Sequence, residues 1–153
     1  MLGPPFAGRS PQLSTAAATQ IAVTFIWLGM VLAISFLEAP LKFRAPHVTL
    51  QIGLGIGRLV FRALNIVEVV FALVLAAIAV SGPAPLRIIV AFGVVVAALA
   101  VQLLAVRPRL TRRSDQVLAG LDAPRSRAHY VYVGLEVVKV VALIVAGILL
   151  LNG

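Results

Sequence analysis

The sequence has no cysteine, only two histidines and few acidic side chains. Without cysteine the chain forms no disulfide, has no thiolate nucleophile and binds no zinc through sulfur. Two histidines are too few for the usual transition-metal sites, so we predict no metal site. Charged residues make up 12% of the chain, against about 25% in an average soluble protein. These shortages point away from a soluble, disulfide-bonded or metal-binding domain.

Hydrophobic residues are what the chain has in abundance. They account for 61% of the sequence, and the mean hydropathy is +1.09. The net charge of +8 comes from basic residues that flank apolar runs, where anionic lipid and control of membrane topology explain them better than nucleic acid does. The composition therefore predicts an integral, multi-pass membrane protein of the plasma or inner membrane. Its expected partner is the lipid bilayer, including anionic lipid at the cytoplasmic face, and no nucleic acid.

Four apolar runs are each long enough to span a bilayer, because ~20 helical residues cover a ~30 Å hydrocarbon core. After a tail at residues 1–18, they define an all-α, four-helix transmembrane bundle over residues 19–151. We expect the first helix to end at Glu38, because Pro40 follows it, and the second to end at a cluster of glycine and proline near residue 82. The expected spans are residues 19–38, 52–80, 86–106 and 129–151.

The distribution of basic residues predicts the orientation of the bundle. A loop at residues 107–128 carries six arginines, and Ser114 within it could cap a short surface helix. The first and third connections together carry eight lysines and arginines, whereas the tail and the second connection carry only Arg9 and Arg87. By the positive-inside rule the basic connections face the cytoplasm and both termini lie on the non-cytoplasmic side.

Polar side chains inside two of the spans recur every three or four residues, so each set occupies one helix face. In the second span they are Arg58, Arg62, Asn65 and Glu68, and in the fourth His129, Tyr132, Glu136 and Lys139. Charged groups within a membrane span are rare and are paired or functional. We expect ion pairs between Glu68 and Lys139, between Arg62 and Glu136, and between Arg58 and the Glu38 carboxylate that ends the first helix.

Two interpretations of these polar stripes stay open at this point. They could hold the helices together, because lipid offers polar groups no partner. Alternatively they line a polar cavity open to the cytoplasm, in which Arg58 and Arg62 hold an anion while His129, Tyr132 and Glu136 move a proton. The number of polar groups exceeds what four short helices need for adhesion and favours a site.

Three further residues or pairs suggest how the helices pack. Gly53 and Gly57 indicate close helix packing rather than a nucleotide loop, since no strand precedes them. Trp27 lies in the middle of the first span and is interpreted as a packing residue. Gln102 in the third span is expected to donate a hydrogen bond into the bundle.

The end of the first helix and the start of the second resemble a family of small membrane proteins. Residues 27–29 read Trp-Leu-Gly, residues 36–44 read Phe-Leu-Glu-Ala-Pro-Leu-Lys-Phe-Arg and residues 57–61 read Gly-Arg-Leu-Val-Phe. These motifs are similar to those of the four-helix proteins related to copper-resistance D and cisplatin-resistance-associated proteins. The resemblance covers about 40 residues, and it implies a four-helix fold without an established activity.

A second resemblance rests on residues 62–68, Arg-Ala-Leu-Asn-Ile-Val-Glu. This segment is similar to the Arg-Ala-x-x-Asn-x-x-Glu signature of the membrane-associated eicosanoid and glutathione metabolism family, with one residue fewer between Arg62 and Asn65. The resemblance implies a trimeric enzyme in which Arg62, Asn65 and Glu68 contact glutathione.

The leading hypothesis is a small membrane protein without a cofactor that binds or passes a polar or anionic solute, or serves as an accessory subunit. Self-association into a homo-oligomer is a further expectation. The alternative is a glutathione-transferase-like enzyme, so enzymatic activity stays open.

Overall fold

Residues 14–121 and 127–152 are described by the structure, a computed structural model. Over these residues the chain forms helices and no strand. Four helical segments are long and apolar enough to cross a membrane, which by length and composition indicates a multi-pass membrane protein. They run Thr15–Arg44, Leu50–Ser81, Leu86–Leu118 and Arg127–Leu151.

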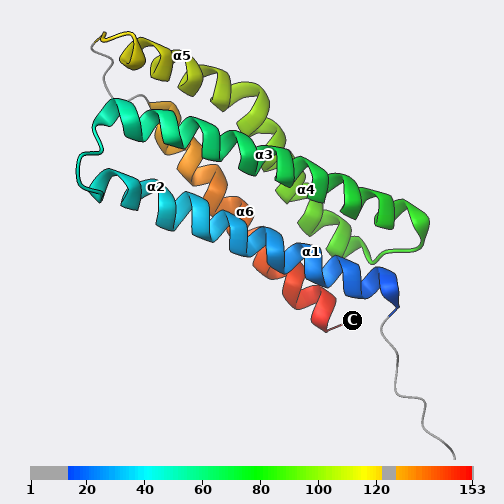
Figure 1. The fold of residues 1–153 in the computed structure, drawn as a ribbon. Helices are drawn as coiled ribbons and strands as arrows, with labels where there is room; N and C mark the ends of the chain where they lie inside the picture. The colour runs from blue at the N-terminus through cyan, green and yellow to red at the C-terminus, as the bar shows by residue number, and fades with distance from the viewer. Residues whose placement is uncertain (1–13, 122–126, 153) are drawn as a thin grey trace, which may run out of the picture.

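The four segments run alternately up and down beside one another (Figure 1). The start of α1 (Thr15–Val31) and the end of α6 (Arg127–Leu151) lie at the same end of the bundle, which we call the terminal end. The opposite end, which we call the basic end, contains α2 (Ala39–Leu41), the start of α3 (Leu50–Ser81) and α5 (Arg107–Leu118). Side-chain caps set two of the helix starts, because Ser14 and Thr49 accept backbone N–H bonds at α1 and α3.

Wide helical turns carry the first segment past the proline that was expected to end it. A π-helical stretch, η1 (Leu32–Glu38), follows α1, and the Ala39 N–H donates to the carbonyl of Ile34 five residues earlier. Pro40 then falls in the first turn of α2, where a missing N–H matters little. The segment continues through the 3₁₀ turn η2 (Lys42–Arg44), so the expectation that this helix stops at Glu38 was wrong.

The third segment repeats this arrangement. Helix α4 (Leu86–Val101) is followed by a π-helical stretch, η3 (Gln102–Val106), and α5 then begins with Pro108 in its first turn. Residues 107–118 were expected in a loop and are instead helical, and Ser114 lies inside α5 rather than at its start. Helix α5 ends at Leu118, and the turn after it contains Gly120, whose φ of 80° suits a residue without a side chain.

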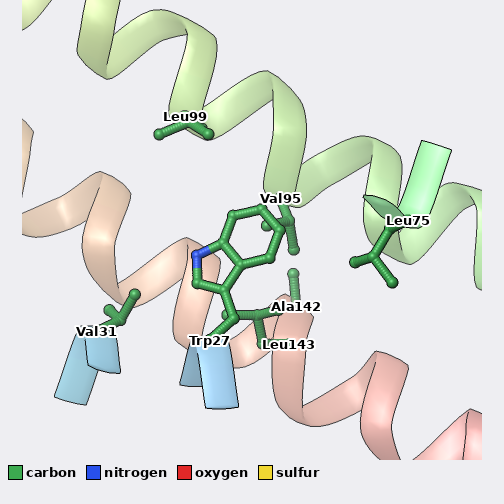
Figure 2. Packing of buried hydrophobic residues seen from close by; sticks show 7 residues of the cluster. All are labelled: Trp27, Val31, Leu75, Val95, Leu99, Ala142 and Leu143. Atoms are coloured by element: carbon green, nitrogen blue, oxygen red, sulfur yellow. The ribbon is translucent and has the colours of Figure 1, made fainter. Parts of the chain in front are cut away.

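Apolar side chains from all four membrane-length segments pack together inside the bundle (Figure 2). Helix α6 packs against both α4 and α1, and α1 packs against α3. The core consists of Trp27, Val31, Leu75, Val95, Leu99, Ala142 and Leu143. Many large apolar side chains face outward along the helices, including Leu59, Leu73 and Leu104. Such an exposed apolar surface is what a lipid environment requires.

Candidate functional site

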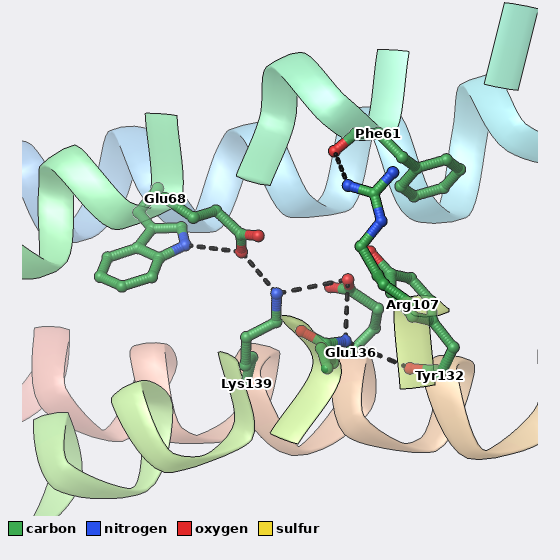
Figure 3. A network of polar contacts seen from close by, with 8 residues as sticks. Phe61, Glu68, Arg107, Tyr132, Glu136 and Lys139 are labelled. Carbon is green, nitrogen blue, oxygen red and sulfur yellow. Dashed lines mark hydrogen bonds and ion pairs between the residues drawn. The ribbon is translucent and has the colours of Figure 1, made fainter. Parts of the chain in front are cut away.

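Three charged side chains meet in the centre of the bundle (Figure 3). The ammonium of Lys139 on α6 lies 2.5 Å from Oε1 of Glu68 on α3 and 3.3 Å from Oε1 of Glu136, one turn away on α6. The three side chains are at most 1% exposed. The predicted ion pair between Glu68 and Lys139 is therefore confirmed. The Trp27 indole nitrogen on α1 also donates to Glu68 Oε1, at 2.9 Å, so this residue does more than pack.

A fourth segment joins through Gln102, the first residue of η3. Its amide nitrogen donates to Glu136 Oε1 at 3.1 Å and to the Tyr132 backbone carbonyl at 3.3 Å. The expected hydrogen bond from this residue into the bundle is confirmed. We call Trp27, Glu68, Gln102, Glu136 and Lys139 the buried network. All four membrane-length segments contribute to it, so its contacts hold the relative depth of each helix.

The second expected ion pair, between Arg62 and Glu136, was wrong. Arg62 is exposed, whereas Glu136 is buried between Lys139 and Gln102. The reason is angular: Arg62 and Glu68 are six residues apart, which at 3.6 residues per turn places them about 120° apart around α3. With Glu68 directed into the bundle, Arg62 points away from its interior.

The third expected pair, between Arg58 and Glu38, was also wrong. Arg58 Nη1 instead lies 2.6 Å from Oδ1 of Asp115, which the unexpected continuation of the third segment into α5 brings alongside α3. Glu38 lies 3.3 Å from the ammonium of Lys42, one helical turn further along its own segment. Each of the two ion pairs thus includes one residue, Lys42 or Asp115, that lies in a helical stretch continuing past a proline.

A cavity of about 190 Å³ lies between the helices toward the basic end. We call it the pocket. Four lysine or arginine side chains line it, together with aromatic and aliphatic groups. These basic residues are Lys42, Arg58, Arg107 and Arg113. Glu136 and Tyr132 line it as well, so the pocket and the buried network share a wall.

Gly57 on α3 leaves room for the Lys42 side chain to lie beside the pocket. Its ammonium lies 5.4 Å from the centre of the Phe61 ring and 5.7 Å from that of Phe43, within cation–π range. A Cβ at Gly57 would come within 2.7 Å of this ammonium, and one at Gly53 would overlap the Phe43 ring. The predicted close packing at both glycines is confirmed, and it places a basic side chain beside the pocket.

Arg107 is a site residue that the sequence analysis missed, since it was assigned to a basic loop. It is partly buried, and its Nη1 donates to the Phe61 backbone carbonyl on α3 at 3.0 Å (Figure 3). The Phe61 ring in turn meets the Tyr132 ring edge-on, with centroids 5.5 Å apart. Pro108 comes next in the chain, and the π-helical stretch η3 just before it allows the segment to continue as helix.

Several buried polar atoms around the network have no hydrogen-bond partner among the described residues. They include both side-chain atoms of Asn65 and one oxygen each of Glu68, Gln102 and Glu136. The Tyr132 hydroxyl neighbours the Glu136 carboxyl without a formed hydrogen bond. A buried unsatisfied polar group costs about 1–3 kcal/mol, so a group of them marks a place where water or a solute can bind.

The structure thus brings together most of the predicted site residues. Asn65, Glu68, Tyr132, Glu136 and Lys139 are buried, and Arg58 and His129 line the pocket. Only Arg62 and Glu38 lie outside both groups. The arrangement can hold an anion beside basic side chains and a proton on a nearby carboxylate. Comparisons with protein-family models, with curated proteins and with solved structures give no match for this chain.

Proposed function

We propose that this protein binds a small anionic solute in the pocket at the basic end, and that this end faces the cytoplasm. Arg107 is the observation that carries the proposal. Its guanidinium lines the pocket and is partly buried, yet none of the ion pairs among the described residues includes it. A guanidinium offers five N–H donors in a fork that fits carboxylate or phosphate oxygens. One donor is used on a backbone carbonyl, which leaves others for a ligand.

The other basic side chains support the same conclusion. Lys42 and Arg58 each have one carboxylate partner, Glu38 and Asp115. The Arg58–Asp115 pair is about half exposed, and such pairs contribute little, so the field in the pocket stays positive. An anion entering the pocket meets Arg107 with Lys42 and Arg58 nearby.

The size and closure of the pocket limit what it can hold. Its volume of about 190 Å³ corresponds to roughly six waters at about 30 Å³ each, and pockets for drug-sized ligands begin near 300 Å³. The buried network and the apolar core fill the bundle between the pocket and the terminal end. The geometry supports one-sided binding of a compact anion such as phosphate, sulfate or a short carboxylate, rather than an open channel.

The proposed orientation rests on where exposed basic residues lie. Arg44, Arg109 and Arg112 are exposed near the basic end, whereas Arg87 is the one basic residue near the terminal end within the described chain. Basic residues next to membrane spans remain preferentially on the cytoplasmic side. The pocket then receives its solute from the cytoplasm.

Ligand-dependent stability tests the proposal. Protein in detergent would be unfolded thermally with 10 mM phosphate, sulfate or succinate, and with chloride at equal ionic strength. We expect at least one of these anions to raise the unfolding temperature, since a ligand at 100 times its Kd stabilises by about 2.7 kcal/mol. In Arg107→Gln the Kd should rise roughly 10- to 100-fold, because a hydrogen bond to a charged group contributes about 1.5–3 kcal/mol.

Arg109→Gln is the matched control, because Arg109 is exposed on the same helix and does not line the pocket. It should bind as the original protein does. Equal loss in both variants, or no stabilisation by any anion beyond that of chloride, would contradict the proposal. Stabilisation by glutathione alone, together with conjugation of its thiol to an electrophile, would instead favour the glutathione-transferase-like alternative.

A further inference from the structure

Glu136 belongs to both the pocket and the buried network. It lines the pocket, and its Oε1 accepts from Gln102 at 3.1 Å while lying 3.3 Å from the Lys139 ammonium. Its other oxygen, Oε2, is buried without a hydrogen-bond partner. The protonation of this carboxylate therefore depends on two things. One is the set of charges inside the buried network, and the other is whatever the pocket contains.

Two carboxylates share one ammonium beside the pocket. Within the network, Glu68 and Glu136 both lie against the single ammonium of Lys139. The other positive charges near Glu136 are the basic side chains of the pocket wall, of which Arg107 is in no ion pair among the described residues. An anion bound to Arg107 adds negative charge next to these carboxylates in a region of low dielectric constant, where an unbalanced charge is expensive.

The groups that face Glu136 come from every segment packed around it. In the network, α6 contributes Tyr132 and Lys139, α3 contributes Glu68, and η3 contributes the uncharged Gln102. The basic residues of the pocket wall are Arg107 and Arg113 on α5, Arg58 on α3 and Lys42 on η2. The first segment contributes no acidic group to the pocket lining. Glu68 is the less suited of the two carboxylates to accept a proton, because its Oε1 is bonded to both Lys139 and Trp27.

We propose that the pocket binds its anion together with one proton, and that the proton is held on Glu136. The proton comes from a buffer acid or hydronium ion in the surrounding solvent, whose conjugate base stays in solution, and it forms an O–H bond at the unpartnered Oε2 of Glu136. This inference rests on the proposed anion binding and adds a second ligand to the same site. Anion affinity should therefore rise as pH falls, with Kd decreasing up to tenfold per pH unit over the range in which one proton is taken up.

The test counts protons taken up as sulfate binds. Sulfate keeps its charge across neutral pH, so protons taken up belong to the protein. Sulfate would be titrated calorimetrically into the full-length protein at several pH values, each in two buffers with different ionisation enthalpies. The difference in apparent binding enthalpy gives the protons absorbed per anion. We expect up to one proton for the original protein and a value near zero for Glu136→Gln.

Two controls separate Glu136 from other titrating groups. His129 also lines the pocket and an imidazole can carry a proton, so His129→Gln tests the competing assignment: if Glu136 holds the proton, sulfate that binds to this variant should still take one up. Glu38→Gln, which alters a carboxylate outside the pocket lining, should also leave the proton count unchanged. Loss of the proton count in His129→Gln instead would overturn the assignment to Glu136.

The outcomes distinguish this inference from the proposal on which it rests. If sulfate binds without proton uptake at every pH tested, the inference fails and the anion site stands. If neither sulfate nor any other anion binds, both fail. The count on the original protein needs no variant, so it decides the question of proton uptake even where Glu136→Gln does not fold.

Discussion

The ammonium of Lys139 is the one positive charge inside the buried network, so its removal is the most informative perturbation of the bundle. Lys139→Met keeps the length of the side chain but leaves Glu68 and Glu136 without their shared partner. Breaking a buried ion pair by removing one partner costs about 3–5 kcal/mol. We expect Lys139→Met to lower the free energy of unfolding by this amount.

A double-mutant cycle isolates the contribution of the pair itself. Glu68→Gln keeps an oxygen that can accept from Trp27 and removes the charge, so it should cost about 1.5–3 kcal/mol, the value of a hydrogen bond to a charged group. In the double variant no unpaired ammonium or Glu68 carboxylate remains. Its destabilisation should be less than the sum of the single values by about 1–3 kcal/mol, at the upper end of couplings between contacting residues.

The same lysine offers an internal comparison. Its ammonium lies 2.5 Å from Glu68 Oε1 but 3.3 Å from Glu136 Oε1. A second cycle with Glu136→Gln should therefore give a smaller coupling energy than the cycle with Glu68→Gln. Neutral polar contacts between membrane helices average about 0.6 kcal/mol, and we expect the Glu68 cycle to exceed that value.

Unfolding can be followed without a label, because Trp27 is the one tryptophan in the sequence and is fully buried against Glu68. Its fluorescence would be recorded during reversible unfolding in detergent micelles with increasing dodecyl sulfate, with circular dichroism as a second probe. If the single effects add in the double variant to within about 0.5 kcal/mol, as for independent sites, the ion pair does not stabilise the bundle and the reasoning is refuted.

Two further predictions concern the packing at a glycine and the topology of the chain. Gly53→Ala should destabilise the protein by about 1–3 kcal/mol, as overpacking does, because a Cβ there overlaps the Phe43 ring. Gly55→Ala has open space around its Cβ and should be neutral or stabilising in the same unfolding assay. Equal effects of the two substitutions would contradict the packing at Gly53. Because the chain has no cysteine, a single introduced cysteine reports on which side of the membrane it lies. In intact cells an impermeant maleimide should label Asn152→Cys, and it should label Arg109→Cys only after permeabilisation. The reverse labelling would invert the proposed orientation.

The sequence was enough to predict how deep a residue lies along its helix. It predicted only in part which way the side chain points around the helix axis. Glu68 and Lys139 lie near the middle of two spans that run the same way, so their pairing followed from counting residues. Arg62 shares the stripe with Glu68 but lies about 120° away on the helix, and a stripe that wide does not determine which residues face inward. That choice is made by the packing of neighbouring helices.

Two of the basic residues that the sequence analysis missed, Lys42 and Arg107, depend on where helices end. Treating Pro40 as a breaker placed Lys42 in a loop, and ending the third span at residue 106 placed Arg107 in another, whereas the π-helical turns η1 and η3 are followed by further helix in both segments. No local pattern in the sequence signals these wide turns. Trp27 was missed as a hydrogen-bond donor for a different reason, because its carboxylate partner lies 41 residues away in the chain.

The lengths of the helices also determine where the pocket sits in a bilayer. Three segments have 30, 32 and 33 residues, or about 45–50 Å at 1.5 Å per residue, which exceeds the ~30 Å of hydrocarbon by roughly half to two-thirds. With the terminal end level with one hydrocarbon boundary, Glu68 and Lys139 lie inside the bundle at the depth of the acyl chains, while Lys42 and Arg58 lie at the depth of the phosphate headgroups. A solute would then reach the guanidinium of Arg107 sideways from this hydrated layer, without shedding its water in the membrane interior.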